Sequence, residues 1–122
     1  MKRQNALYQA SKVLEHRTAV LNAALWYLQF NWMTTDGLAR SLNVSGNTIN
    51  KWLCEAVANR YIINDEICIQ IMRKHVREYE HKHQIKNSSL RQMYKNAFEA
   101  RSKGKNAIDV DAIINGKQKA CH

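Results

Sequence analysis

Four residues near the middle of the chain have side chains and a spacing suited to hydrogen-bonding a partner from one face of a helix. They are Gly46, Asn47, Asn50 and Lys51. On a helix they lie opposite the apolar Ile49 and Trp52, so we expect them to face outward. An Asn carboxamide can pair with adenine through two hydrogen bonds, a Lys ammonium can reach guanine or phosphate, and a Gly allows close approach. This set predicts the reading of nucleic-acid bases.

Two short amphipathic helices must position this face. Residues 34–53 read TTDGLARSLNVSGNTINKWL, with a break at residues 43–45. Apolar residues recur at helical spacing on both sides of the break: Leu38, Ala39 and Leu42 before it, Ile49, Trp52 and Leu53 after it. We expect Thr34 or Thr35 to cap the first helix and Ser45 to cap the second. Asn43 tolerates the left-handed conformation that the turn needs.

This segment resembles the helix-turn-helix of bacterial and phage DNA-binding regulators, whose second helix enters the major groove of DNA. The resemblance covers about 20 of the 122 residues, and Asn43 stands where the family usually has Gly. It implies a mainly α fold with a three-helix core, double-stranded DNA as the partner, and base reading by Gly46, Asn47, Asn50 and Lys51. We expect phosphate contacts from polar and basic groups around this core: Thr35, Arg40, Ser45, Arg60, Arg101, Lys103 and Lys105.

Residues 61–71 allow two interpretations. The β-prone residues 61–63, the turn dipeptide Asn64-Asp65 and the alternation over residues 66–71 predict a short β-hairpin. Such a hairpin resembles the wing of winged-helix proteins. Alternatively, Asp65 caps a helix that starts near Glu66 and continues through Met72.

Leucines recur at intervals of seven in the N-terminal region, at Leu7, Leu14, Leu21 and Leu28. This period is helical, although Arg17 interrupts it, so one helix and two helices both remain open. The stripe either faces the core of its own chain or forms the seam of an intermolecular coiled coil. We expect a homodimer, with this stripe or residues 90–98 as the contact.

The net charge of +9 suggests an anionic partner, but its distribution is uneven. Residues 1–31 carry +3, residues 32–71 carry −1 and residues 72–122 carry +7. We therefore expect residues 1–71 to form the DNA-binding domain with its N-terminal helix. Residues 72–122 form a basic helical region that packs on the same domain or oligomerises.

The remaining composition argues against catalysis, metal binding and membrane insertion. Carboxylates are scattered, the five histidines lack metal-ligand spacing and are expected to be solvated, and no cofactor motif occurs. No apolar run approaches the roughly 18 residues of a membrane span. The three cysteines are an odd number without metal-like spacing, as in cytoplasmic proteins with reduced thiols.

The interpretation that combines these features is a sequence-specific double-stranded DNA-binding protein, a small transcriptional regulator of phage, plasmid or bacterial origin that acts at the nucleoid. Three alternatives remain. The chain could be a DNA-binding assembly component resembling a phage small terminase subunit, or the DNA-binding part of a recombinase or replication initiator. It could also be an inhibitor that uses the helix-turn-helix corner to bind a protein.

Overall fold

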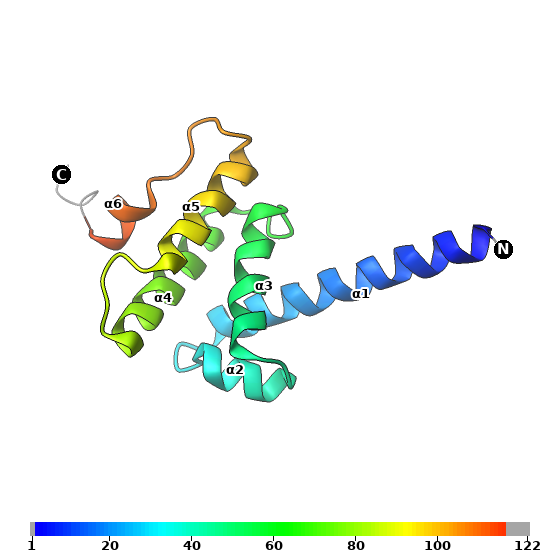
Figure 1. Cartoon of the computed structure of the whole chain (residues 1–122), viewed down its shortest axis with the longest axis horizontal. Coiled ribbons are helices and arrows are strands. Elements are labelled where there is room, and N and C mark those ends of the chain that lie inside the picture. The colour runs from blue at the N-terminus through cyan, green and yellow to red at the C-terminus, as the bar shows by residue number, and fades with distance from the viewer. Residues whose placement is uncertain (1, 117–122) are drawn as a thin grey trace.

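The computed structural model describes residues 2–116, with side chains from residue 6 onward, and it is mainly helical, as expected. Its helices are α1 (Lys2–Gln29), α2 (Thr35–Leu42), α3 (Gly46–Ala58), α4 (Asp65–His83), α5 (Ser89–Ser102) and α6 (Val110–Ile114). No strand occurs within this range. Figure 1 shows α1 as a long rod whose N-terminal half projects away from the cluster that the other helices form.

The caps and the turn expected around α2 and α3 are confirmed. The Thr34 hydroxyl accepts a hydrogen bond from the Gly37 amide at 3.0 Å, and the Ser45 hydroxyl accepts one from the Thr48 amide at 3.1 Å. Between the helices, Asn43 adopts the left-handed conformation with φ 57° and ψ 47°. Two short helices therefore meet at a tight three-residue turn.

The prediction of a β-hairpin wing is wrong, because residues 65–71 belong to α4. The Asn64 side chain caps this helix by accepting from the Ile67 amide at 3.0 Å, and Asp65 and Glu66 occupy its first turn, where the helix dipole favours acids. The buried residues of α4 recur every three or four positions: Cys68, Ile71, Met72, His75 and Val76. The apparent alternation was the first part of this helical stripe, so the alternative helix is correct, with Asn64 rather than Asp65 as the cap.

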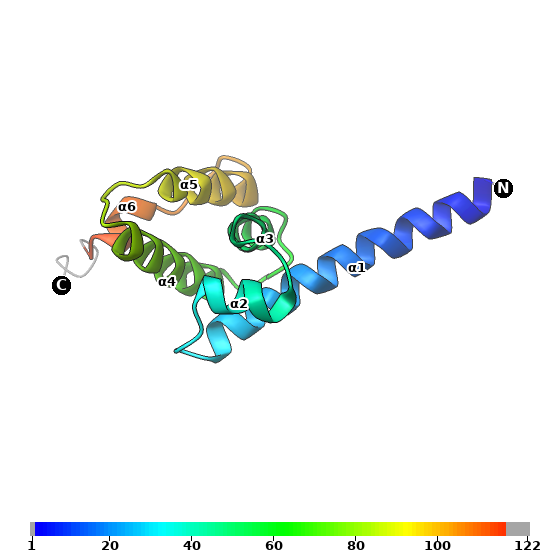
Figure 2. The same cartoon turned by 60° about the horizontal axis from the view of Figure 1, so that its bottom comes forward.

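Helix α3 lies at the centre of the fold and contacts α1, α2, α4 and α5. Figure 2 looks along α3 and shows the other helices arranged around it. Its buried side chains, Ile49, Leu53, Cys54, Ala56 and Val57, fill the middle of the core. The position of α3 therefore determines how every neighbouring helix packs.

Helix α1 is continuous, which settles the open question of one helix or two. Its C-terminal half packs on the core through Val20, Ala23, Ala24 and Tyr27. Leu7 and Leu14 are exposed, so the core-facing interpretation of the leucine stripe fails for its first half. The apolar side chains of residues 90–98 are mostly buried, which removes that segment as a dimer contact: Leu90, Tyr94, Ala97 and Phe98.

The boundary expected after residue 71 falls inside α4, and buried residues from both sides of it form one cluster. Two arginines of the basic region, one of them the expected phosphate contact Arg101, instead join helices inside the fold. Arg91 donates to Glu80 and Asp111, joining α5 to α4 and α6. Arg101 donates to the Asp65 carboxylate at 2.8 Å and to the carbonyls of Val57 and Ile63.

Glu80 should make folding dependent on acid pH. Its carboxylate accepts hydrogen bonds from the Arg91 guanidinium and from the Ser88 amide and hydroxyl, which lowers the pKa of Glu80 to about 2. Because the unfolded chain takes up this proton at the ordinary carboxyl pKa of about 4.5, the free energy of unfolding should fall as the pH drops from about 5 towards 2. Urea denaturation across this range should show a weaker pH dependence for Glu80→Gln than for the parent.

The matched control is Glu99→Gln, which changes an exposed carboxyl on α5. It should keep the pH dependence of the parent. If Glu80→Gln also keeps it, the hydrogen bonds of Glu80 do not stabilise the fold.

Candidate nucleic-acid interface

Helix α3 has only a narrow solvent-exposed face, because its neighbours cover the rest. Within the helix, Asn47 and Lys51 are exposed, and they lie one turn apart on the same line. Gly46 and Thr48 are half-buried beside them. The outward direction expected for Asn47 and Lys51 therefore agrees with their position in the structure.

The first turn of α3 is open to a partner. A Cβ atom built on Gly46 would meet no atom within 4 Å, so the backbone there is accessible. Ser45 is exposed. Its hydroxyl accepts a hydrogen bond from the Thr48 amide and lies 2.9 Å from the Thr48 hydroxyl. A helix N-terminus carries partial positive charge, so this turn suits the approach of an anionic molecule.

Asn50, which was expected to read bases, is half-buried, and it lines a polar hollow beside Asn47 while its side-chain oxygen is engaged within the fold. Its Oδ1 atom lies 2.7 Å from Nε2 of His75 on α4. The Nδ1 atom of His75 lies 2.6 Å from the Tyr94 hydroxyl on α5. Because Oδ1 can only accept, Nε2 donates to Asn50, and Nδ1 accepts from Tyr94. Asn50 thus joins three helices from inside.

His75 is buried, so the expectation that all the histidines are solvated is wrong for this one. Burial lowers the pKa of His75 to about 3, which keeps the imidazole neutral near pH 7. The sequence did contain a signal for its burial, since His75 continues the apolar stripe of α4 between Met72 and Val76. Its partners are far away in the sequence and could not be identified from it.

The N-terminus of α2, where a phosphate contact by Thr35 was expected, already holds an anion from the same chain. The Glu78 carboxylate accepts from the Thr35 amide at 2.8 Å and from the Thr35 hydroxyl at 2.7 Å. It also accepts from the Tyr27 hydroxyl at 2.6 Å. The two donors of Thr35 are therefore engaged, and sequence reasoning missed Glu78.

The basic residues expected to contact phosphate divide into two groups. Four of them are exposed: Arg40, Arg60, Lys103 and Lys105. Arg60 also donates to the carbonyl of Arg101 at 3.2 Å, which places it near the C-terminal end of α5. Arg101 itself is buried and tied to Asp65, so the structure does not offer it to a phosphate.

The C-terminal half of the α3 surface is acidic. The Glu55 carboxylate lies 2.6 Å from Nε2 of His16 on α1 and accepts from the Tyr61 hydroxyl at 3.2 Å. A carboxylate repels phosphate, so Glu55 disfavours an anion at the C-terminal half of α3. At the N-terminal half, Asp36 and Glu78 line the hollow beside Asn47, together with Lys82.

Other chemistry has little support in the described part of the chain. No group of three or more His, Cys, Asp or Glu residues there could hold a metal ion. Cys54 is buried, and burial raises the pKa of its thiol to about 12, so a reactive thiolate does not form near pH 7. Within residues 2–116, no helix combines the length and the apolar character needed to cross a membrane.

Comparison of the chain with protein-family models, with curated proteins and with solved structures finds no match.

The two asparagines of α3 should respond differently to truncation. Asn50→Ala leaves the buried Nε2–H group of His75 without an acceptor, which should cost about 1–3 kcal/mol of unfolding free energy. Asn47→Ala changes an exposed side chain and should stay within about 0.5 kcal/mol of the parent. Urea denaturation of both variants measures the difference, and an Asn50→Ala variant as stable as Asn47→Ala would contradict the assignment.

Proposed function

We propose that this protein binds double-stranded DNA in a sequence-specific manner through α2 and α3, as a small regulator of phage, plasmid or bacterial origin. One observation carries the proposal. The left-handed Asn43 and the Ser45 cap set α3 at a tight turn from α2, and the N-terminal half of α3 presents Asn47 and Lys51 to solvent. Two short helices with these features are suited to place the second helix in the major groove.

In the proposed complex, the first turn of α3 enters the groove. The Asn47 carboxamide can pair with N6 and N7 of adenine, and the Lys51 ammonium can reach guanine O6 and N7 or a phosphate. Arg40 is exposed on the neighbouring α2, where it can contact the phosphates beside the groove. We assign base reading to Asn47 rather than to Asn50, because the Asn50 side-chain oxygen is already bonded to His75.

This reading surface is small. Two side chains can specify only a few base pairs, so we propose that specificity comes from two copies of the chain on a site with two half-sites. Homodimerisation thus forms part of the proposed function.

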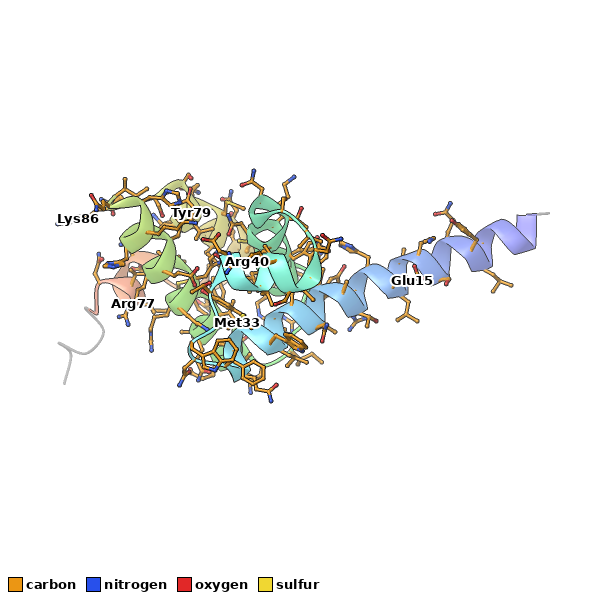
Figure 3. All side chains as sticks on the ribbon, turned by 90° about the horizontal axis from the view of Figure 1, so that it is seen from below. Glu15, Met33, Arg40, Arg77, Tyr79 and Lys86 are labelled. Atoms are coloured by element: carbon orange, nitrogen blue, oxygen red, sulfur yellow. The ribbon has the colours of Figure 1, made fainter. Side chains whose placement is uncertain are left out.

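A second candidate function, binding of a protein partner, is favoured by an aromatic hollow formed by the end of α1, the α1–α2 connection and α2. The hollow measures about 650 Å³ and is lined by Trp26, Phe30, Trp32 and Arg40, among others. The Phe30 and Trp32 rings are 5.3 Å apart, and Trp32 is 73% exposed. Figure 3 shows Met33, another lining residue, and Arg40 on the same side of the molecule. Exposed aromatic clusters are typical of protein-interaction surfaces.

Asn47 should matter for specific DNA and not for random DNA. We expect Asn47→Ala to weaken binding to a duplex recovered by selection from a random library by about 1–3 kcal/mol, roughly 5- to 150-fold. The variant lacks the carboxamide that hydrogen-bonds the base. On random duplex its affinity should stay close to that of the parent. Fluorescence anisotropy with labelled duplexes at one fixed salt concentration measures both affinities.

The matched control is Asn31→Ala, which removes an exposed carboxamide in the connection between α1 and α2. It should bind both duplexes as the parent does. If the parent binds no duplex at low salt, the DNA proposal fails and the protein-binding candidate takes its place. If Asn47→Ala binds the selected duplex as tightly as Asn31→Ala, α3 does not read bases through Asn47.

A further inference from the structure

The projecting half of α1 carries apolar side chains that nothing in its own chain covers. Residues 6–18 are all exposed. Leu7 is 66% exposed and Leu14 is 64% exposed, and Ala10 lies between them on the same face. Figure 3 shows Glu15 on this half of α1, where no other helix reaches it.

An isolated helix of this length is marginally stable in water, because most helical stability in proteins comes from packing of an apolar face. The two leucines and Ala10 provide such a face, but the fold of one chain leaves it in solvent. This part of α1 is therefore suited to a packing partner outside its own chain.

A second apolar face lies on the other half of the same helix. Val20, Ala23, Ala24 and Tyr27 pack on the core, but Leu25 lies about 160° around the helix from Tyr27 and is 59% exposed. Leu21 and Leu28, on the same side as Leu25, are half-buried, and Leu28 also packs against the core of its own chain. The face of Leu21, Leu25 and Leu28 continues the line of Leu7, Ala10 and Leu14 along the rod.

We propose that α1 pairs with α1 of a second copy of this chain in antiparallel orientation. Leu7, Ala10 and Leu14 of each copy pack on Leu28, Leu25 and Leu21 of the other, in that order. The facing residue numbers have the same total in all three pairs, so one two-fold axis relates both halves of the contact. The small Ala10 faces the large Leu25, which allows the two helices to interdigitate.

The polar centre of the stripe does not oppose this pairing. The axis passes between residues 17 and 18, and the Arg17 guanidinium lies 5.2 Å from the centre of the Tyr61 ring of its own chain. Arg17 is therefore held against the body of the protein. The seam from Leu7 to Leu28 is about 32 Å long, slightly more than three heptads, which is the length expected of a stable coiled coil.

A parallel pair fits less well. It would place Leu25 on Leu25 and Ala10 on Ala10, giving one crowded layer and one gap. It would also bring the hollows that contain Leu28, Arg73 and Arg77 of the two copies close together, so that like charges face each other. The antiparallel pair keeps the two hollows at opposite ends of the rod, where each faces the end of α1 that begins with Lys2 and Arg3 of the other copy.

Cysteine cross-linking tests the orientation. In a chain that carries Cys121→Ser, we expect a disulfide-linked dimer when Leu14→Cys and Leu21→Cys proteins are mixed and oxidised. Neither protein should form a disulfide when it is oxidised alone. Position 14 of one copy faces position 21 of the other, so the two copies of position 14 lie about 10 Å apart along the helix axis. Cys54 and Cys68 are buried and should not compete.

Light scattering of the full chain at tens of micromolar tests the association itself. The parent should have the mass of a dimer, and Leu14→Glu should be monomeric. The matched control Lys12→Glu, a charge change on another face of the exposed half of α1, should remain dimeric. A monomeric parent overturns the proposal. So does a disulfide formed by Leu14→Cys alone, or a dimer that forms no disulfide either in the mixture or with one protein alone.

The pairing rests on the homodimerisation that forms part of the proposed function, but pairing and contact with DNA can fail separately. The mass of Leu14→Glu reports on pairing, while binding of the parent to random duplex reports on DNA contact.

Discussion

One buried imidazole fixes the rotation of the central helix. His75 on α4 hydrogen-bonds Asn50 on α3 and Tyr94 on α5, so that each of the three helices supplies one member of the network. A buried polar group that loses its partner costs free energy, so α3 cannot turn about its axis without breaking this network. With Asn50 held inward, the outward line of the helix consists of Asn47 and Lys51. The proposed function depends on this constraint.

The sequence predicted those features that depend on close neighbours. The caps at Thr34 and Ser45 and the left-handed Asn43 each depend on residues within four positions, and the structure contains all three. The prediction of a wing was wrong because the apolar pattern of residues 66–71 fits both a strand and a helix. Only the burial of the later turns of α4 decides between the two. The role of Asn50 could not be predicted, since its partner is 25 residues away and is known only from the packing of α3 on α4.

Net charge alone overestimates the surface that this chain can offer to an anion. Arg91 and Arg101 are used in the interior to hold α5 against its neighbours, and Lys82 pairs with Asp36. Glu78 fills the positive end of α2 that a phosphate would otherwise occupy. The exposed cations on α2 and α3 are Arg40 and Lys51. The proposed binding of DNA would therefore need cations from a second copy of the chain or from outside the α2–α3 pair.

The proposed function requires the N-terminal half of α3 to be the surface that meets DNA. Backbone amide signals of the full-length protein, followed by NMR during titration with duplex DNA, test it most directly. We expect the largest shifts at Gly46, Asn47, Thr48 and Lys51, with smaller shifts at Arg40 and almost none in α6. Large shifts confined to the aromatic hollow or to α5 and α6, with α3 unchanged, would contradict it.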